Sequence, residues 1–284
     1  MNVEEPVIAL RGVSKRFGRT LDLAARLARR ARRALGGTVR DEVVRAVDNV
    51  DMVVRKGEVV GLVGESGCGK STIGRMVAGI LAPSEGAVLF KGHDLTTLDA
   101  HAARAAKLKV QMIFQDPYAS LNPRMRVAEI VGEAPRVHGM IPRGQFDAYV
   151  DAQLRRAGLD PAFKRRYPHQ FSGGQRQRIG IARALALDPE ILVADEAVSA
   201  LDVSVQAQVL ALLEDLKQRL GLSMLFITHD LRVAAQVCDR IAVMQHGKLL
   251  EVQPTAALFA APQHPYTQEL LAAVPGAAMV ARSA

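Results

Sequence analysis

Short apolar runs recur along the chain and alternate with stretches in which apolar residues follow helical spacing. The apolar runs predict strands at residues 7–11, 43–54, 59–63, 87–90, 108–114, 191–194, 224–228, 241–244 and 248–252. Helical spacing predicts helices at residues 73–80, 175–187 and 205–220. Strands that alternate with helices in this way are typical of an α/β fold. No apolar run approaches the roughly 18 residues that a membrane-spanning helix needs.

The pattern changes between residues 116 and 170, where prolines recur and the apolar spacing becomes helical throughout. We interpret this stretch as a small helical subdomain inserted into the α/β core. The core is then discontinuous and comprises residues 1–115 and 171–252. Residues 253–284 are expected to form a C-terminal tail of helical pieces, because prolines interrupt the helical spacing there.

A glycine-rich loop lies between the predicted strand 59–63 and the predicted helix 73–80. Its residues are Gly64, Glu65, Ser66, Gly67, Cys68, Gly69, Lys70, Ser71 and Thr72, which fit the phosphate-loop pattern G-x-x-x-x-G-K-[ST]. Such a loop turns backbone N–H groups toward phosphate oxygens, and the helix N-terminus adds partial positive charge. Lys70 would reach the β- and γ-phosphates, and the Ser71 hydroxyl would bind Mg²⁺. The loop predicts that the chain binds a nucleoside triphosphate.

Polar residues follow three other apolar runs. Asp195 and Glu196 end the run at 191–194, Gln115 ends the run at 108–114, and His229 follows the run at 224–228. An acid at this position can hold Mg²⁺, and a second acid can orient an attacking water. Each residue taken alone could equally be structural, and only their occurrence together in this order indicates a catalytic site.

A second glycine turn, formed by Ser172, Gly173, Gly174 and Gln175, opens the predicted helix 175–187. A helix N-terminus of this kind binds anions. The phosphate loop already supplies one such site, so this turn points to a second phosphate contact.

With these motifs in this order, the chain resembles the ATP-binding subunit of an ABC transporter over about residues 5–252. The resemblance implies an α/β P-loop NTPase (RecA-like) core with an N-terminal antiparallel β region and an inserted helical subdomain. It implies that ATP is contacted by Phe17, by residues 64–72, by the signature residues Ser172, Gly173, Gly174 and Gln175, and by Asp202. It implies catalytic roles for Lys70, Gln115, Glu196 and His229, and Mg²⁺ binding by Ser71, Gln115 and Asp195. Ala197 stands where the family usually has Pro, a departure that removes no catalytic group.

Three stretches resemble the peptide/nickel importer group of this family, namely residues 113–124, 198–208 and 264–267. Tyr118 and Ala119 are similar to the OppF/DppF type within that group. The resemblance implies an ATPase that powers import of di- or oligopeptides, with nickel or another small solute as alternatives. The implied partners are a second ATPase subunit (a paralogue or a second copy), two permease subunits and, indirectly, an external solute-binding protein. No cysteine follows Cys238, so no iron–sulfur cluster is expected.

Charge adds one further feature. The formal net charge is +8, but residues 11–40 hold ten Lys or Arg and one Asp, which leaves 27 basic and 28 acidic residues elsewhere. Residues 21–35 have the spacing of a basic amphipathic helix, either a solvated surface insertion or a contact for lipid head groups or a partner.

An uneven charge of this kind argues against a chain-wide nucleic-acid footprint. The basic segment at residues 11–40 is the only support for the rival interpretation, a soluble ABC ATPase that acts on DNA or ribosomes. A non-hydrolytic regulatory paralogue is less well supported, because all catalytic positions are filled. The two cysteines lack metal-ligand spacing and no signal-peptide pattern is present, so we expect a cytoplasmic, reduced protein. The resemblance implies a location on the cytoplasmic face of the membrane, held there through permease subunits.

Overall fold

The computed structural model describes residues 6–18 and 43–273. The expected basic helix at 21–35 lies outside the described residues. One sheet has six strands in the order β10-β9-β3-β8-β7-β6. Its strands are β3 (Val59–Val63), β6 (Val110–Ile113), β7 (Ile191–Asp195), β8 (Ser223–Thr228), β9 (Arg240–Gln245) and β10 (Lys248–Pro254). All neighbouring pairs are parallel except β9 and β10.

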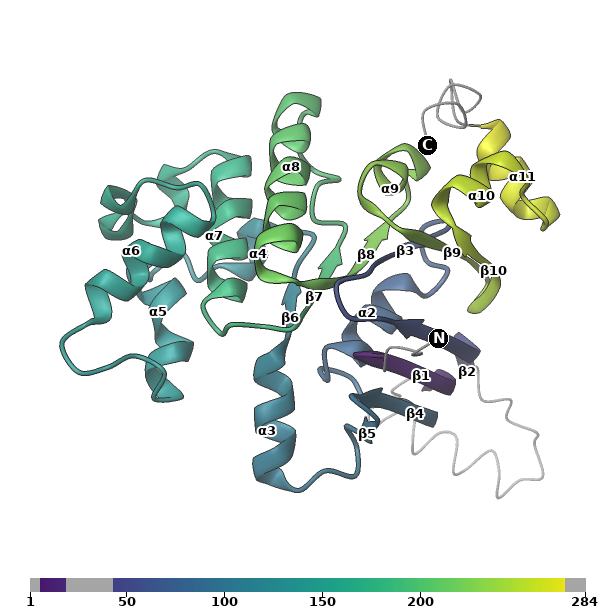
Figure 1. Ribbon diagram of the computed structural model, residues 1–284, viewed down its shortest axis with the longest axis horizontal. Coiled ribbons are helices and arrows are strands. Elements are labelled where there is room, and N and C mark those ends of the chain that lie inside the picture. Colours follow the sequence, from purple (N-terminus) through teal and green to yellow (C-terminus); the bar gives the residue numbers. More distant parts are fainter. Residues whose placement is uncertain (1–5, 19–42, 274–284) are drawn as a thin grey trace, which may run out of the picture.

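A second sheet has four strands in the order β2-β1-β4-β5, and its pairs are antiparallel. It consists of β1 (Ile8–Gly18), β2 (Val43–Val54), β4 (Glu85–Phe90) and β5 (His93–Asp94). Helix α2 (Lys70–Val77) packs against both sheets, contacting β7 and β8 of one and β2 of the other (Figure 1). This arrangement agrees with the expected α/β core with an N-terminal antiparallel region.

Helices account for the rest of the described chain. Between β6 and β7 lie α4 (Pro117–Ser120), α5 (Val127–Val137), α6 (Phe146–Arg156), the 3₁₀ turns η1 (Pro161–Arg165) and η2 (Pro168–Gln170), and α7 (Gly173–Leu185). The others are α3 (Ala100–Lys109), α8 (Val203–Leu220), α9 (Leu231–Val237), α10 (Thr255–Ala260) and α11 (Pro265–Ala272). Helices α5 and α6 lie at the opposite end of the molecule from α10 and α11 (Figure 1). No helix within residues 6–18 and 43–273 is both long enough and apolar enough to span a membrane.

Several predicted boundaries are wrong by a few residues; for example, the helix expected at 73–80 is α2 at Lys70–Val77. Residues 108 and 109 were expected to begin a strand, but they form the last turn of α3, and β6 starts at Val110. The Asp99 side chain caps this helix by accepting hydrogen bonds from the His101 and Ala102 N–H groups. An N-cap aspartate followed by several alanines favours a helix, and the sequence analysis did not use this signal.

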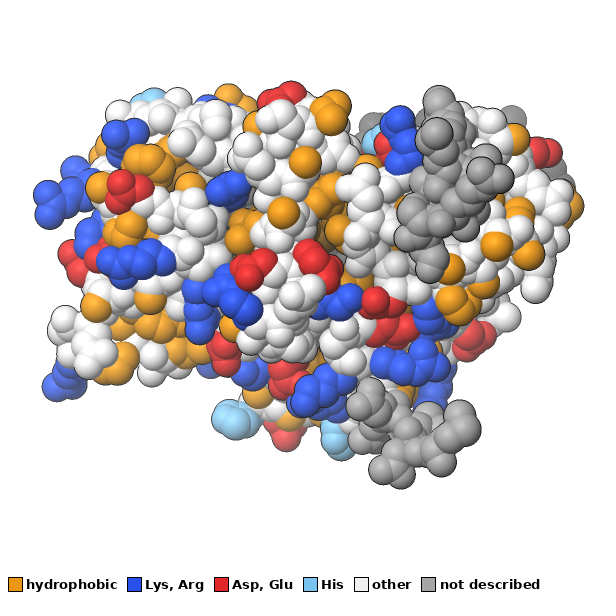
Figure 2. Space-filling view, turned by 45° about the horizontal axis from the view of Figure 1, so that its top comes forward, with side chains coloured by type: hydrophobic (Ala, Val, Ile, Leu, Met, Phe, Trp, Pro, Cys, Tyr) orange, Lys and Arg blue, Asp and Glu red, His pale blue; other side chains and the backbone are white. Residues whose placement is uncertain are grey.

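The surface of the described residues carries both signs of charge. On the face shown in Figure 2, acidic and basic side chains lie scattered among apolar and polar ones. Some of them form ion pairs, such as Lys164 with Asp151 at 2.9 Å and Arg16 with Glu85 at 2.8 Å. This mixture agrees with the nearly balanced charge outside residues 11–40.

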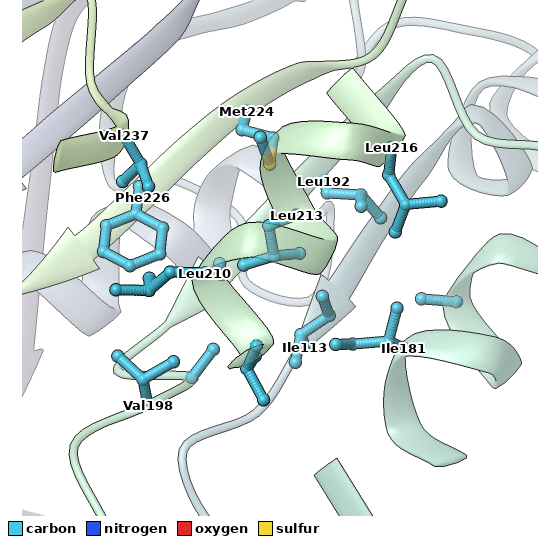
Figure 3. Packing of buried hydrophobic residues seen from close by; sticks show 14 of the residues in the cluster. Ile113, Ile181, Leu192, Val198, Leu210, Leu213, Leu216, Met224, Phe226 and Val237 are labelled. Carbon is cyan, nitrogen blue, oxygen red and sulfur yellow. The ribbon is translucent and has the colours of Figure 1, made fainter. Parts of the chain in front are cut away.

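Aliphatic side chains fill the core on both faces of the six-stranded sheet. On one face, Leu210, Leu213 and Leu216 of α8 pack with Phe226 of β8 and Leu192 of β7 (Figure 3). All five are at most 5% exposed. Because β7 and β8 are covered on both sides, nearly every residue in them is apolar and the strands read as continuous apolar runs.

Four parallel strands of this sheet, β3, β6, β7 and β8, bring their carboxyl ends to one edge. The phosphate loop follows β3, Gln115 follows β6, Glu196 follows β7 and His229 follows β8. Ligands of open parallel sheets bind at this edge. The fold therefore gathers residues that are up to about 165 positions apart in the sequence.

Candidate functional site

The phosphate loop contains backbone that only glycine tolerates. Gly69 precedes α2 with φ of 112°, and a Cβ placed there would lie 2.1 Å from the Ala46 carbonyl oxygen. Both the left-handed conformation and this contact exclude a side chain. The loop and the start of α2 thus approach β2 closely, which explains why a glycine stands directly before α2.

Lys70, the first residue of α2, is buried at 4% exposure. Its Nζ donates hydrogen bonds to the carbonyl oxygens of Gly64 at 2.6 Å and Glu65 at 2.7 Å. The ammonium group is therefore held against the loop that it follows. It lies in reach of a phosphate carried by the same loop.

Ser71 and Asp195 meet across the space between α2 and β7. The Ser71 hydroxyl donates a 2.9 Å hydrogen bond to Asp195 Oδ1. Asp195 is 5% exposed, and this burial raises the pKa of its carboxyl. The hydrogen bond from Ser71 lowers that pKa and the charge of Glu196 raises it, so that the net shift is upward.

This pair of oxygens fits Mg²⁺, which prefers hard oxygen ligands and keeps several waters beside one or two carboxylates and the substrate phosphates. Among residues 6–18 and 43–273, no group of three or more His, Cys, Asp or Glu side chains could hold a metal ion alone.

Glu196 lies next to the loop and is engaged from two sides. The Gln115 amide nitrogen donates a 2.7 Å hydrogen bond to its Oε2, and His229 Nδ1 lies 3.5 Å from its Oε1. Glu196 has φ of 47°, a left-handed conformation that costs energy for a residue with a side chain. The backbone is fixed there by a 2.9 Å hydrogen bond from the Glu196 N–H to the Ile227 carbonyl oxygen of β8.

A pocket of about 200 Å³ connects the loop with this cluster. It is lined by Ala46, Ser66, Gly67, Gly69, Lys70, Ser71, Thr72, Gln115 and Glu196. The structure therefore brings together eight of the predicted site residues in one hollow. Cys68 is buried behind it, and burial raises the pKa of its thiol.

Other predicted site residues lie apart from this pocket. Phe17 is 42% exposed on β1, opposite Val44 of β2. The Ser172 hydroxyl accepts a hydrogen bond from the Gln175 N–H and so caps α7, while the Asp202 carboxylate caps α8 by accepting from the Val205 N–H. None of Phe17, residues 172–175 or Asp202 lines the pocket of its own chain.

Tyr266 of α11 is a site neighbour that sequence reasoning missed. Its hydroxyl accepts a 3.2 Å hydrogen bond from the Glu65 N–H, 201 positions away in the sequence. Residues 264–267 resemble a subgroup of the family, but no local sequence pattern connects them with the phosphate loop.

Comparison with known proteins matches this geometry. Residues 47–199 fit the family model described as ABC transporter. The chain belongs to the ABC transporter family. Within that family it is 52% identical over 233 residues to the oligopeptide transport ATP-binding protein AppF of Bacillus subtilis (strain 168), covering 82% of this chain and 71% of AppF. It is 46% identical over 272 residues to a Brucella ovis protein whose name includes "peptide import ATP-binding protein", covering 96% of this chain and 80% of that protein.

Solved structures agree. The ATP-binding cassette MJ0796, solved as a dimer bound to ADP and Pi, superposes with a TM-score of 0.72 at 28% identity, covering 87% of this chain and 98% of MJ0796. The fold is also shared with cbiO1 of Clostridium perfringens, with a TM-score of 0.73 at 24% identity over 95% of this chain and 94% of cbiO1. The chain is an ABC ATPase that binds and hydrolyses ATP.

Proposed function

We propose that this chain is the ATP-hydrolysing subunit of an importer for di- or oligopeptides. The observation that carries the ATPase part is the convergence of Lys70, Ser71, Asp195, Glu196 and Gln115 around one pocket at the strand ends. The peptide part is supported by the two relatives named for peptide and oligopeptide transport, each of which this chain covers over more than two thirds of its length.

The chemistry follows from the positions of these side chains. Lys70 would exchange its two loop carbonyls for phosphate oxygens of ATP. Ser71 and Asp195 would hold Mg²⁺, which when bound neutralises charge on the phosphates. Glu196 would accept the proton of the attacking water, since its carboxylate borders the pocket. Gln115 and His229 orient that carboxylate from two sides, and they would contact the water or the γ-phosphate.

We further propose that a second ATPase subunit, either a paralogue or a second copy, completes the ATP-binding site. The exposed Ser172 and the N-terminus of α7 form an anion-binding end that does not line the pocket of its own chain. A facing subunit could offer the same end to the γ-phosphate. The dimeric MJ0796 structure supports this arrangement, and Asp202, which caps α8, would lie at the same interface.

The remaining partners are two permease subunits, which would hold this chain at the cytoplasmic face of the membrane, and indirectly a solute-binding protein. We assign nucleotide chemistry to the core formed by residues 1–115 and 171–252, into which the helical segment 116–170 is inserted. Nucleic acid is not proposed as a partner, because the described face in Figure 2 carries both signs of charge intermixed.

Purification from membranes tests this function. A tagged copy of the chain should bring down permease subunits and a second ATPase, and the assembled complex should hydrolyse ATP faster when peptide-loaded binding protein is added. Stimulation by nickel-loaded but not peptide-loaded binding protein would contradict peptide import. Recovery of ribosomes or DNA in place of permeases would contradict transport itself.

A further inference from the structure

The C-terminal tail contacts the phosphate loop at a single peptide unit. The Glu65 N–H donates its 3.2 Å hydrogen bond to the Tyr266 hydroxyl. The carbonyl of the same planar peptide unit belongs to Gly64, and that oxygen accepts the 2.6 Å hydrogen bond from Lys70 Nζ. Tyr266 and Lys70 therefore hold opposite sides of one rigid plane.

Tyr266 is itself firmly placed. It is 5% exposed and sits in the first turn of α11, where its N–H donates to His264 Nδ1 at 3.1 Å. Burial raises the pKa of its phenol, so the hydroxyl stays neutral and keeps its proton at physiological pH. A buried hydroxyl of this kind gives the Glu65 N–H a fixed acceptor that does not depend on bulk water.

The tail is fastened to the core sheet by Glu251 of β10, which is 7% exposed. Its carboxylate accepts hydrogen bonds from the N–H groups of Gln263 at 2.8 Å and His264 at 3.0 Å, and from the Gln253 side chain at 2.6 Å. Burial alone would raise the pKa of Glu251, but the Thr267 hydroxyl and these donors outweigh it and lower the pKa. Glu251 is thus a charged anchor for the turn that leads into α11.

A second contact runs from the same part of the chain to the same loop. The Gly247 N–H, in the turn between β9 and β10, donates a 3.0 Å hydrogen bond to the Cys68 carbonyl oxygen. Residues 247–267 therefore bind the loop at Glu65 and at Cys68, on either side of its exposed tip, Ser66 and Gly67. Lys70 of α2 also contacts both sides of the tip, since its Nζ donates to the Glu65 carbonyl oxygen and to Cys68 Sγ.

We infer that Tyr266 is a positioning residue for ATP binding, and that the tail helix α11 supports the nucleotide site. By fixing the peptide unit between Gly64 and Glu65, Tyr266 sets the direction of the carbonyl that holds Lys70 and so the starting position of its ammonium group. This inference rests on the proposed function, in which the phosphate loop binds ATP. It gives the C-terminal tail a part in ATP binding, in addition to the residues of the catalytic cluster.

The test compares two variants that each remove one hydrogen-bonded tyrosine hydroxyl from the full chain. Tyr266→Phe keeps the ring and loses the contact with Glu65, whereas Tyr149→Phe loses a 2.6 Å hydrogen bond to the Ala186 carbonyl oxygen, away from the loop. One lost hydrogen bond corresponds to an effect of about 2- to 10-fold. We expect Tyr266→Phe to raise the dissociation constant for ATP by that factor, and Tyr149→Phe to leave it unchanged.

Amide hydrogen exchange without nucleotide reads the contact directly. In Tyr266→Phe, and not in Tyr149→Phe, exchange should become faster in the peptide that contains Glu65. Glu251→Gln should shift both readouts in the same direction, and the double variant Glu251→Gln with Tyr266→Phe should lose less than the product of the two single effects.

The inference is overturned if Tyr266→Phe binds ATP as the parent does and leaves exchange at Glu65 unaltered. A purely structural tyrosine would lower the denaturation midpoint in both phenylalanine variants alike and spare ATP affinity. If the parent chain itself failed to bind ATP, the ATPase assignment would fail, while the exchange experiment would still decide whether Tyr266 holds the loop.

Discussion

The Gln115 side chain donates a 2.7 Å hydrogen bond to Glu196, although 81 positions separate the two residues in the sequence. They meet because β6 and β7 are neighbouring parallel strands and each residue follows the end of its strand. His229, after β8, approaches the other carboxylate oxygen at 3.5 Å. The orientation of Glu196 is thus fixed by three adjacent strand ends, which places a carboxylate next to the phosphate loop before ATP arrives.

Gly69→Ala should disable the phosphate loop. The substitution forces a side chain into a left-handed conformation, which costs about 1–2 kcal/mol, and places its Cβ 2.1 Å from the Ala46 carbonyl oxygen. We expect a loss of about 2 kcal/mol or more in the free energy of unfolding, and no measurable ATP binding by calorimetry.

Gly180→Ala is the matched control. Gly180 lies within α7, has ordinary helical backbone and has open space where the Cβ would go. Alanine there should stabilise the protein by up to about 1 kcal/mol and leave ATP binding intact. If Gly69→Ala has the same free energy of unfolding and the same ATP affinity as Gly180→Ala, the loop is not packed against Ala46 as described.

Asp195→Asn should make the nucleotide-free protein more stable and remove its activity. Burial raises the folded-state pKa of Asp195 above its ordinary value of 3.8, so the parent loses stability as pH rises from about 3.8 through the folded pKa. Asparagine carries no charge and escapes this loss. The advantage of the variant in urea unfolding should therefore be absent below that window and full above it.

Hydrolysis by Asp195→Asn should fall on the order of 100-fold or more, because Mg²⁺ loses its carboxylate ligand and the several kcal/mol of charge stabilisation that depend on it. If Asp195→Asn is no more stable than the parent at pH 7, burial of the charged Asp195 carboxylate does not destabilise the folded parent.

Phe17→Ala should weaken ATP binding without touching the phosphate contacts. Phe17 is exposed on β1 and lies opposite Val44, two residues before Ala46 of the pocket. An aromatic face that stacks on adenine is worth about 1–3 kcal/mol, by analogy with base stacking in nucleic-acid complexes. Calorimetry should show weaker ATP binding by Phe17→Ala and near-parent binding by Phe17→Tyr, which keeps a ring. Unchanged binding by Phe17→Ala would assign the ring to packing.

Much of the site could be predicted because its signals are local. The phosphate loop is one continuous stretch, and Gln115, Glu196 and His229 each follow an apolar run that the core requires. What could not be predicted depends on contacts between distant segments. The bond between Glu65 and Tyr266 has no local sequence signal, because it arises only when the tail folds back over β9 and β10.

Helix α3 was missed for a different reason. Its alanines carry little periodic signal, since alanine is tolerated on the buried and the exposed side of a helix alike. Asp202 shows a further limit of sequence reasoning. Its carboxylate caps α8, a task that any N-cap aspartate performs, and a sequence alone does not separate this task from a role at an interface.

The central claim is that ATP is bound between two ATPase subunits. Glu196→Gln removes the carboxylate that would accept the proton of water but spares the groups that would bind ATP, so it should slow hydrolysis and allow the closed dimer to persist. Ser172→Arg in addition would place bulk at the α7 end that, in the proposed dimer, would face the γ-phosphate of the partner. Ala162→Arg, at an exposed position in η1, controls for the added charge.

Size-exclusion chromatography with light scattering, with and without ATP, is the direct measurement. Glu196→Gln, alone or mixed with its paralogue, should run as a dimer with ATP and as a monomer without it. Adding Ala162→Arg should leave that dimer intact, and adding Ser172→Arg should abolish it. A dimer that persists with ATP in the Glu196→Gln, Ser172→Arg variant would contradict the sandwich, as would parent-rate hydrolysis by Glu196→Gln in the assembled transporter.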